Sequence, residues 1–220
     1  MPAGARRSRR PNEVGSAVKL QADAPRLVLA SASASRRALL QAAGLRFAAQ
    51  AAAVDEAAAK QGAREAGASA ADTALLLAEM KAQRIARREP DALVIGCDQL
   101  LVCGERWFDK PADRAEARAH LCALRGRTHE LVTAVLCLRA GRRIWHHVAR
   151  PRLTMRDFTD DFLDAYLAAE GDAVTTTVGA YRLEGLGVHL FDAVEGEHAA
   201  ILGLPLLPLL GFLRQHRVLL

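Results

Sequence analysis

The 220-residue chain lacks the long apolar run that a membrane-spanning helix requires, since no segment approaches about 20 consecutive apolar residues. Residues 1–25 contain arginines but lack the apolar core of about seven or more residues that a secretory signal peptide needs. We therefore expect a soluble, cytoplasmic protein that does not partner with a membrane.

Cysteine and lysine are both scarce. The four cysteines, Cys97, Cys103, Cys122 and Cys137, form no CxxC pair, and only Cys122 has a histidine close in sequence. We expect packing residues in a reducing compartment rather than disulfides or zinc ligands. The chain has 4 lysines against 26 arginines. A lysine at the edge of a core therefore suggests a position that needs a compact ammonium group.

The net charge of +5 is unevenly distributed. Residues 1–25 contribute three of these positive charges, which leaves two for the rest of the chain. A short polar segment containing glycine and proline is typical of a disordered basic leader, so we place the folded domain at residues 26–220. An over-long start-site assignment and a nucleic-acid-binding arm are alternatives for the leader. The low charge of the remaining chain argues against nucleic acid as the main partner.

Hydrophobic patterning alternates between strand-like and helix-like segments. We expect strands at 26–30, 92–97 and 100–104, a hairpin at 129–139 and 143–153, and helices at 35–43, 72–89, 110–125, 159–171 and 203–219. The helix at 110–125 is expected to begin with Pro111 at its first position. Residues 47–56 are expected to be extended, and residues 57–70 a loop or short helix. This mixture favours a mixed-sheet α/β or α+β architecture.

The segment LASASASRRALL (29–40) lies at an expected strand-to-helix junction. Free backbone N–H groups and the helix dipole favour an anion there. Ser33 or Ser35 can add a hydroxyl, and Arg36 and Arg37 add positive charge. A serine N-cap followed by solvated arginines is the simpler alternative. No GxxxxGK[ST] occurs, so the segment is not a P-loop.

Acidic residues at two places are candidates for holding a divalent cation. Asp55 and Glu56 end an extended segment, and magnesium in phosphate sites commonly takes only one or two protein carboxylates. Asp98 follows a buried strand, where α/β sheets usually hold ligands, and it can serve as a metal ligand or as a base for water. A solvated acidic loop and a turn-bonding aspartate are the respective alternatives.

Two lysines complete the candidate chemistry. Lys81 lies between Leu77 and Ile85 at the border of an apolar helix face, and Lys110 precedes a helix that can attract anions. A lysine that only buries its alkyl stem and a solvated lysine are the alternatives. Cations for phosphates, carboxylates for a metal and an aspartate for water together suit metal-assisted phosphoanhydride hydrolysis. Neither GxSxG nor HExxH is present.

These motifs resemble the Maf family, the septum-formation-inhibitor-like nucleoside triphosphate pyrophosphatases, over about residues 26 to 215. The blocks that carry the resemblance are LASASASRRALL (29–40), VDE (54–56), LAEMKA (77–82), VIGCDQ (94–99), DKP (109–111), GRTHELVTAV (126–135), VGAYRLEGLG (178–187) and EG…ILGLPL (195–206). Their shared order makes the resemblance far more specific than any single block.

The resemblance implies an α/β fold of the Maf/ITPase-like type, with a mixed twisted sheet flanked by helices and two lobes around a central cleft. It also implies a divalent metal (Mg²⁺ or Mn²⁺), a homodimer, and cleavage of a nucleoside triphosphate to monophosphate and pyrophosphate. The family's active-site positions fall on Ser33, Arg36, Glu56, Lys81, Asp98 and Lys110. Asp98 matches the proton acceptor. Glu56 and Asp98 would hold the metal and water, and the three cations would neutralise the triphosphate.

Three further positions vary with substrate choice within the family that this sequence resembles. Ser35, Gln99 and Glu184 stand where dTTP/UTP pyrophosphatases carry Arg, Thr and Gln, and where 7-methyl-GTP pyrophosphatases carry Trp, Gln and Glu. Two of the three agree with the 7-methyl-GTP branch. A carboxylate at Glu184 can accept from the N1–H and amino group of a guanine-type base, whereas thymine or uracil offers one N–H. Ser35 removes a possible cation–π platform.

The leading hypothesis is a pyrophosphatase acting on 7-methyl-GTP or another modified or non-canonical nucleoside triphosphate. One alternative is a dTTP/UTP-type pyrophosphatase. Another is a non-catalytic nucleotide-binding regulator of cell division that uses the same pocket as a sensor.

Overall fold

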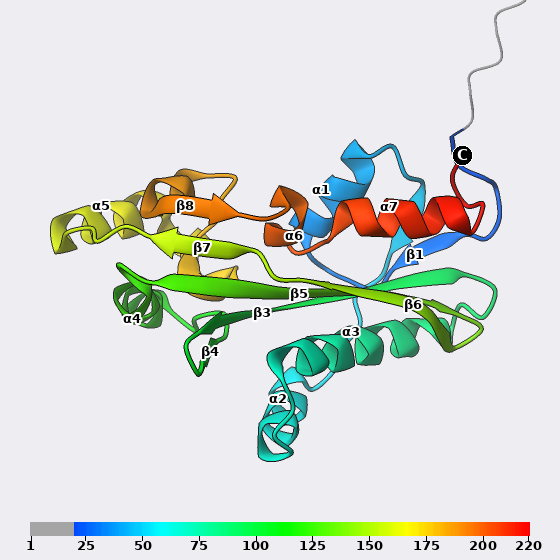
Figure 1. The fold of residues 1–220 in the computed structure, drawn as a ribbon, viewed down its shortest axis with the longest axis horizontal. Coiled ribbons are helices and arrows are strands. Elements are labelled where there is room, and N and C mark those ends of the chain that lie inside the picture. The colour runs from blue at the N-terminus through cyan, green and yellow to red at the C-terminus, as the bar shows by residue number, and fades with distance from the viewer. Residues whose placement is uncertain (1–19) are drawn as a thin grey trace, which may run out of the picture.

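One eight-stranded mixed sheet organises the fold (Figure 1). The computed structural model of the protein describes residues 20–220. The strand order is β2-β1-β3-β5-β7-β8, with β4 paired to β3 and β6 paired to β5. The strands are β1 (Leu27–Leu29), β2 (Phe47–Ala49), β3 (Leu93–Cys103), β4 (Arg106–Phe108), β5 (Thr128–Arg139), β6 (Arg142–Ala149), β7 (Arg152–Met155) and β8 (Phe191–Glu195).

The helices cover both faces of this sheet (Figure 1). The α-helices are α1 (Ala34–Ala42), α2 (Glu56–Glu65), α3 (Ala70–Ala86), α4 (Arg114–Leu124), α5 (Asp160–Glu170), α6 (His198–Ile201) and α7 (Leu206–Gln215). Three 3₁₀ helices, η1 (Gly171–Thr175), η2 (Val178–Ala180) and η3 (Leu186–Leu190), lie between α5 and β8. The expected α/β architecture with a mixed sheet flanked by helices is confirmed.

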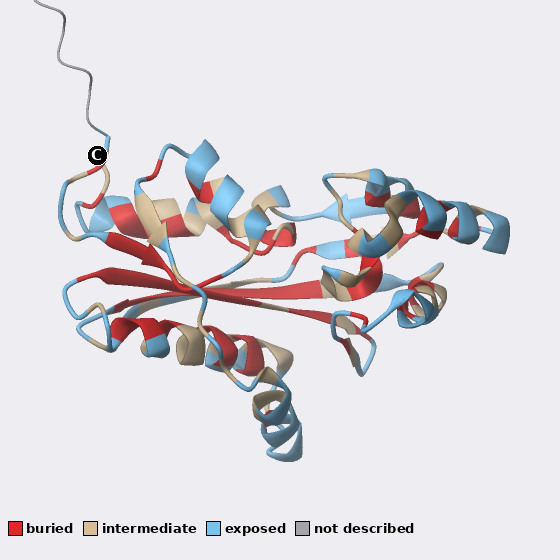
Figure 2. Ribbon diagram, turned by 180° about the vertical axis from the view of Figure 1, so that it is seen from behind, coloured by how far each residue is buried: buried red, intermediate tan, exposed pale blue. Residues whose placement is uncertain are grey.

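The first lobe is a three-layer sandwich around the long strands β3 and β5. Strands β1, β2 and β3 are parallel, and β5 runs antiparallel to β3. Because side chains alternate along a strand, Val94 packs with α3 on one face while Ile95 packs with α1 and α7 on the other. Both faces of β3 are therefore apolar, which explains the nearly continuous hydrophobic run of its sequence (Figure 2).

A glycine brings α3 unusually close to the sheet. A Cβ atom added at Gly96 of β3 would lie 2.4 Å from the Ala78 carbonyl oxygen and 2.8 Å from the Ala82 Cβ. Real Cβ atoms do not approach other atoms this closely, so any side chain at position 96 would push α3 outward. The glycine and the facing alanines therefore fix the spacing between α3 and β3.

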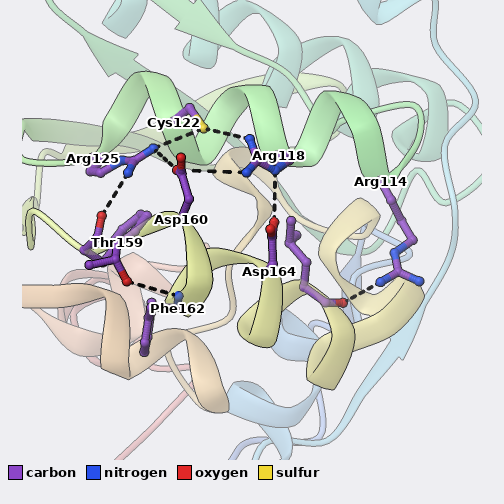
Figure 3. Close-up of polar contacts among 10 residues, drawn as sticks. Arg114, Arg118, Cys122, Arg125, Thr159, Asp160, Phe162 and Asp164 are labelled. Carbon is purple, nitrogen blue, oxygen red and sulfur yellow. Dashed lines mark hydrogen bonds and ion pairs between the residues drawn. The ribbon is translucent and has the colours of Figure 1, made fainter.

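The second lobe surrounds a separate apolar cluster that includes Phe108, Leu121 and Leu163. Polar contacts also join its helices α4 and α5 (Figure 3). Arg125 donates to Asp160 at 2.8 Å, and Arg118 donates to Asp164 at 3.1 Å. These pairs are exposed, so the apolar cluster supplies most of the stability of this lobe.

The cysteines mainly serve packing, as the sequence predicts. Cys97, Cys103 and Cys137 are buried, and burial raises the pKa of the Cys97 thiol to about 11. Cys122 is partly buried and accepts weak hydrogen bonds from two arginines of its own helix region (Figure 3). All four are free thiols.

Strand β3 corrects one sequence prediction. Two strands were expected at 92–97 and 100–104, because the polar pair Asp98-Gln99 interrupts the apolar run. The structure has one strand of 11 residues, and the pair lies in its middle. Pairing with β5 continues without a break from Leu93 to Val102, so the partner strand carries the extended conformation across the polar residues.

The start of one helix also differs from expectation. The helix expected from Lys110-Pro111 begins instead at Arg114, where the Asp113 side chain accepts from the Glu116 N–H at 2.8 Å. An aspartate cap determines the start in place of Pro111. The region expected as a loop or short helix at 57–70 contains the ten-residue α2, which begins at Glu56. The short strands β4 and β8 were not anticipated.

The first described residues contact the C-terminal end of the chain. Gln21 pairs with Leu219 in an isolated bridge, and its side chain exchanges hydrogen bonds with the Arg46 backbone at 2.7 and 2.9 Å. These contacts attach Gln21 to the folded part of the chain. The expected disorder of residues 1–19 lies outside the described residues. Within the described chain, no helix combines the length and apolarity needed to cross a membrane.

Candidate active site

The site forms at an opening in the edge of β3. On the side away from β5, β1 pairs with Leu93–Ile95 and β4 pairs with Leu101–Cys103. Between these stretches, no strand within residues 20–220 covers that edge. Asp98 and Gln99 face opposite sides of the sheet, yet both reach the same opening. The sequence predicts Asp98 at the end of its own strand, but the residue lies in the middle of β3. It does lie beyond the carboxyl end of the neighbouring parallel strand β1.

A cavity of about 410 Å³ occupies this opening, which is the size range of small-molecule sites. It lies between the lobes, with α1, α2, α3 and β3 on one side and residues 176–184 on the other. The expected central cleft between two lobes is therefore present. All nine site residues proposed from the sequence line it, namely Ser33, Ser35, Arg36, Glu56, Lys81, Asp98, Gln99, Lys110 and Glu184.

Lys81 joins the two carboxylates at the centre of the cavity. Its Nζ lies 2.8 Å from a Glu56 oxygen and within hydrogen-bonding distance of Asp98. The side chains of Lys81 and Asp98 are only 12% and 6% exposed, whereas that of Glu56 is 45% exposed. The position of Lys81 on the border of the apolar face of α3 therefore has an electrostatic purpose, because its ammonium compensates the buried carboxylate.

The surroundings of Glu56 favour its ionised form. Burial raises its pKa, but the hydrogen bond and charge of Lys81 oppose this effect, together with the charges of Lys60 and Lys110. The net result is a pKa below the usual value of 4.5. Its neighbour Asp55 has a different task, because its carboxylate caps α2 by accepting from the Ala58 N–H at 3.0 Å. Of this acidic pair, only Glu56 lines the cavity.

The turn from β1 into α1 places Ser33 and Arg36 at the cavity. Ser33 is the N-cap of α1, and its hydroxyl accepts from the Arg36 N–H at 3.4 Å. The Arg36 guanidinium donates to the carbonyl oxygens of Gly203 at 2.8 Å and Cys97 at 3.0 Å. A third bond reaches the Ser31 hydroxyl at 3.2 Å. Arg36 thus satisfies the Cys97 carbonyl on the open edge of β3, and its Nη2 group is left for a ligand. Arg37 is exposed and lies outside the cavity.

Gln99 is held by its amide nitrogen. This nitrogen donates to the Thr133 hydroxyl at 2.8 Å and to the carbonyl oxygens of Ala200 and Ile201 at 3.1 and 3.0 Å. The amide oxygen of Gln99 is the group left to meet a ligand, so this residue offers an acceptor to the cavity.

The other end of the cavity brings together residues that are distant in sequence. The Ser35 hydroxyl donates to a Glu184 carboxylate oxygen at 3.4 Å, across 149 positions of the chain. Glu170, the last residue of α5, has a side chain only 2% exposed. It accepts from Arg182 at 2.9 Å and from the Leu186 N–H at 3.2 Å. Glu170 therefore fixes both ends of segment 182–186, which carries Glu184.

A buried tyrosine and histidine support the same end. Tyr181 lines the cavity, and its hydroxyl lies 2.7 Å from His129 Nε2. His129 is 1% exposed, and its Nδ1 has no hydrogen-bond partner among the described residues. Burial lowers the pKa of His129 to about 4, so the imidazole is neutral at physiological pH. Burial likewise raises the pKa of the Tyr181 hydroxyl, which stays protonated.

Sequence reasoning missed several residues that line the cavity. Lys60 of α2 points to the same space and forms an ion pair with Asp109. Thr176, Thr177 and Arg182 line the opposite wall. The scarcity of lysine was a usable signal for Lys60, whereas nothing in the sequence separates these threonines from surface threonines.

The carboxylates also bear on whether a metal could bind. The described residues contain no group of three or more His, Cys, Asp or Glu side chains placed to hold a metal ion. Glu56 and Asp98 nevertheless both approach one nitrogen, that of Lys81. Two oxygen donors are sufficient for magnesium when phosphate oxygens of a substrate complete the coordination. The donor set therefore fits a hard divalent cation that arrives together with a phosphate ligand.

A mixed α/β fold whose central cavity combines ammonium groups, a guanidinium and two carboxylates defines a polyphosphate-binding class of protein. Comparison with known families specifies this class, because the family described as Maf-like protein matches residues 26–216. The chain belongs to the Maf family.

Curated relatives extend this result. A protein of Granulibacter bethesdensis named nucleoside triphosphate pyrophosphatase is 58% identical over 194 residues, covering 88% of this chain and 98% of the relative. One of Rhodospirillum rubrum with the same name is 54% identical, covering 89% and 97%. A protein of Rhizobium meliloti named 7-methyl-GTP pyrophosphatase is 51% identical, covering 87% and 96%.

Proposed function

We propose that this protein is a nucleoside triphosphate pyrophosphatase, which hydrolyses its substrate to a nucleoside monophosphate and pyrophosphate. The observation that carries the proposal is the contact of Lys81 with both Glu56 and Asp98 inside a cavity that also holds Arg36 and Lys110. The names of the relatives from Granulibacter bethesdensis and Rhodospirillum rubrum support the same activity.

In this reaction, a water oxygen attacks the α phosphorus, and the bond from this phosphorus to the oxygen that bridges the α and β phosphates breaks. Asp98 accepts the proton that the water loses, and pyrophosphate leaves with the bond electrons. The contact with Lys81 orients the Asp98 carboxylate before the attack. Arg36, Lys81 and Lys110 neutralise the negative charge that the triphosphate brings into the cavity.

A divalent cation, Mg²⁺ or Mn²⁺, would be held by Glu56 and Asp98. When bound, such an ion supplies positive charge to the phosphate oxygens and lowers the pKa of a coordinated water. The protein itself must hold the two carboxylates close together. The contacts of Lys81 with both of them do so before any substrate binds.

For the base, we propose a guanine-type substrate such as 7-methyl-GTP. Glu184 and the amide oxygen of Gln99 both offer acceptors to the cavity. A guanine-type base presents two donors on one edge, N1–H and the amino group, while thymine and uracil present one. The name of the Rhizobium meliloti relative supports this choice.

A nucleotide panel tests the proposal. The purified full-length protein is incubated with magnesium and each of GTP, 7-methyl-GTP, dTTP, UTP and ATP, and pyrophosphate release is measured. We expect turnover with the highest kcat/KM for a guanine-type nucleotide. Recovery of every nucleotide unaltered would reject the enzymatic function, and tight binding without turnover would favour the non-catalytic regulator instead.

A further inference from the structure

The lysines of this protein are concentrated at one place. The described part of the chain contains three, Lys60, Lys81 and Lys110, and all three line the central cavity. Of the many described arginines, only Arg36 and Arg182 line this cavity, and others lie on the surface and at the lobe contacts. A lysine ammonium is a compact charge that turns freely on a flexible stem, which suits a ligand whose charged oxygens shift during a reaction. Lys60 is the member of this group for which the proposed mechanism gives no role.

The setting of Lys60 resembles that of a binding residue. It follows Glu56 by one turn of α2, so both side chains face the cavity. Its side chain is 13% exposed, whereas that of its partner Asp109 is 54% exposed. The ammonium therefore lies inside and the carboxylate at the rim. Glu56, one turn earlier on the same helix, is a proposed metal ligand, so Lys60 lies beside the region proposed for the metal and the phosphates.

The pair of Lys60 and Asp109 is not needed to attach α2. The Arg64 guanidinium packs over the Trp107 ring, 4.7 Å from its centroid, and Ala63 is buried. Glu56 adds the ion pair to Lys81. An ion pair with a half-exposed carboxylate contributes at most a small stabilisation. The pair can therefore open when a ligand offers the ammonium a more highly charged partner.

We propose that Lys60 is a further triphosphate-binding residue. Asp109 holds the Lys60 ammonium before substrate binds. When substrate binds, a phosphate oxygen replaces the Asp109 carboxylate as the partner of Lys60. The proposal rests on the function proposed above. Asp109 competes with the substrate for Lys60, so the two residues of one ion pair have opposite effects on affinity. If the ion pair only attached α2, removal of either partner would change the substrate affinity in the same direction.

Lys60→Gln and Asp109→Asn separate these two roles. Binding of inorganic pyrophosphate in the presence of magnesium is measured by calorimetry, and KM and kcat are measured with the best nucleotide of the panel. We expect Lys60→Gln to weaken pyrophosphate binding and raise KM about 10-fold, because a charged hydrogen bond is lost. Since the contact exists before and during the reaction, kcat should change by less than about twofold. Asp109→Asn should strengthen binding about twofold to threefold.

Arg64→Gln is the matched control, because it removes the same charge from the same helix but outside the cavity. We expect Arg64→Gln to change the affinity for pyrophosphate by less than about twofold, because salt screens a charge that lies outside the cavity. Equal weakening by Lys60→Gln and Asp109→Asn, no effect of Lys60→Gln, or an equal effect of Arg64→Gln would each overturn the proposal. Absence of turnover by the unmodified protein would reject the proposed function alone, because the pyrophosphate measurements would still decide the role of Lys60.

Discussion

The two ends of the cavity are built in different ways. At one end, Glu56, Lys81 and Asp98 come from long regular elements, α2, α3 and β3, and contact one another directly. At the other end, Glu184 lies in an irregular segment between two 3₁₀ helices and is placed by Glu170. At the charged end, Lys81 and Asp98 are buried in the first lobe, while the Glu184 end depends on a few polar contacts of the second lobe.

This difference separates the two tasks of the site. Among the groups proposed for phosphate chemistry, Lys81 and Asp98 are fixed by packing that a sequence cannot easily change without unfolding. The groups proposed for base recognition lie on a segment that can vary without disturbing the central sheet. One scaffold can in this way retain its reaction while its base preference changes.

Asp98→Asn should have the largest effect, and it acts on the rigid end. We expect kcat to fall by about 10³-fold, because the group proposed to accept the proton is removed while the shape of the side chain is retained. Circular dichroism and thermal unfolding should show an intact fold. Near-normal turnover in this variant would reject Asp98 as the proton acceptor.

His129→Gln tests the support beneath Tyr181 at the opposite end. The pKa of His129 is about 4 in the folded protein and about 6.5 in an unfolded chain. The unfolded state therefore binds more protons as the pH falls from about 6.5 to 4, and this destabilises the fold. Between pH 7 and 4, we expect the unmodified protein to lose about 3 kcal/mol more unfolding free energy than His129→Gln.

Urea denaturation at a series of pH values measures this difference. Glutamine can retain a hydrogen bond to Tyr181 but does not titrate, which makes the pair of proteins a direct comparison. Parallel pH profiles for the two proteins would show that His129 does not titrate with a lowered pKa.

Glu170→Gln should weaken selectivity more than catalysis. The neutral amide loses the charged contact to Arg182, and the segment bearing Glu184 becomes less well ordered. We expect the ratio of kcat/KM between GTP and dTTP to fall about 10-fold, a loss of about 1.4 kcal/mol of discrimination. The exposed Glu195→Gln provides the control for removing a carboxylate from the same lobe. A uniform loss of activity with both nucleotides would assign Glu170 to folding only.

Ser35→Trp should have the smallest effect and would sharpen the description of the base end. An indole beside Glu184 adds a surface for a cationic ring. We expect KM for 7-methyl-GTP to fall about fivefold relative to that for GTP, within the usual range of cation–π energies. Steady-state kinetics with both nucleotides measures the ratio. Equal changes with the charged and the neutral base would contradict the cation–π explanation.

The elements with strong hydrophobic periodicity could be predicted from the sequence, and those set by partners could not. The helix at 70–86 follows from its capping serine and apolar spacing. The single long β3 does not, because β5 alone carries the strand through Asp98 and Gln99. The alanine-rich α2 has too little periodicity to be recognised, although Asp55 caps it in the usual way.

The candidate site shows the same division. Motifs led to all nine residues, and the structure places all of them around one cavity. Their tasks in the fold were not visible in the sequence. The hydrogen bond from Arg36 to the Gly203 carbonyl and the contact of Ser35 with Glu184 each join segments more than 140 residues apart. Lys60 was not identified because the sequence left open whether residues 57–70 form a loop or a short helix, so the face on which Lys60 lies could not be predicted.

Gly96 gives the fold a hidden sensitivity. It lines no part of the cavity, yet the closeness of α3 to β3 that it permits sets how near Lys81 comes to Asp98. In a genetic screen for loss of activity, a substitution at Gly96 should therefore be recovered among the inactive alleles although every residue that meets the substrate is unchanged. The chemistry proposed for this protein thus depends on an absent side chain as much as on the charged ones.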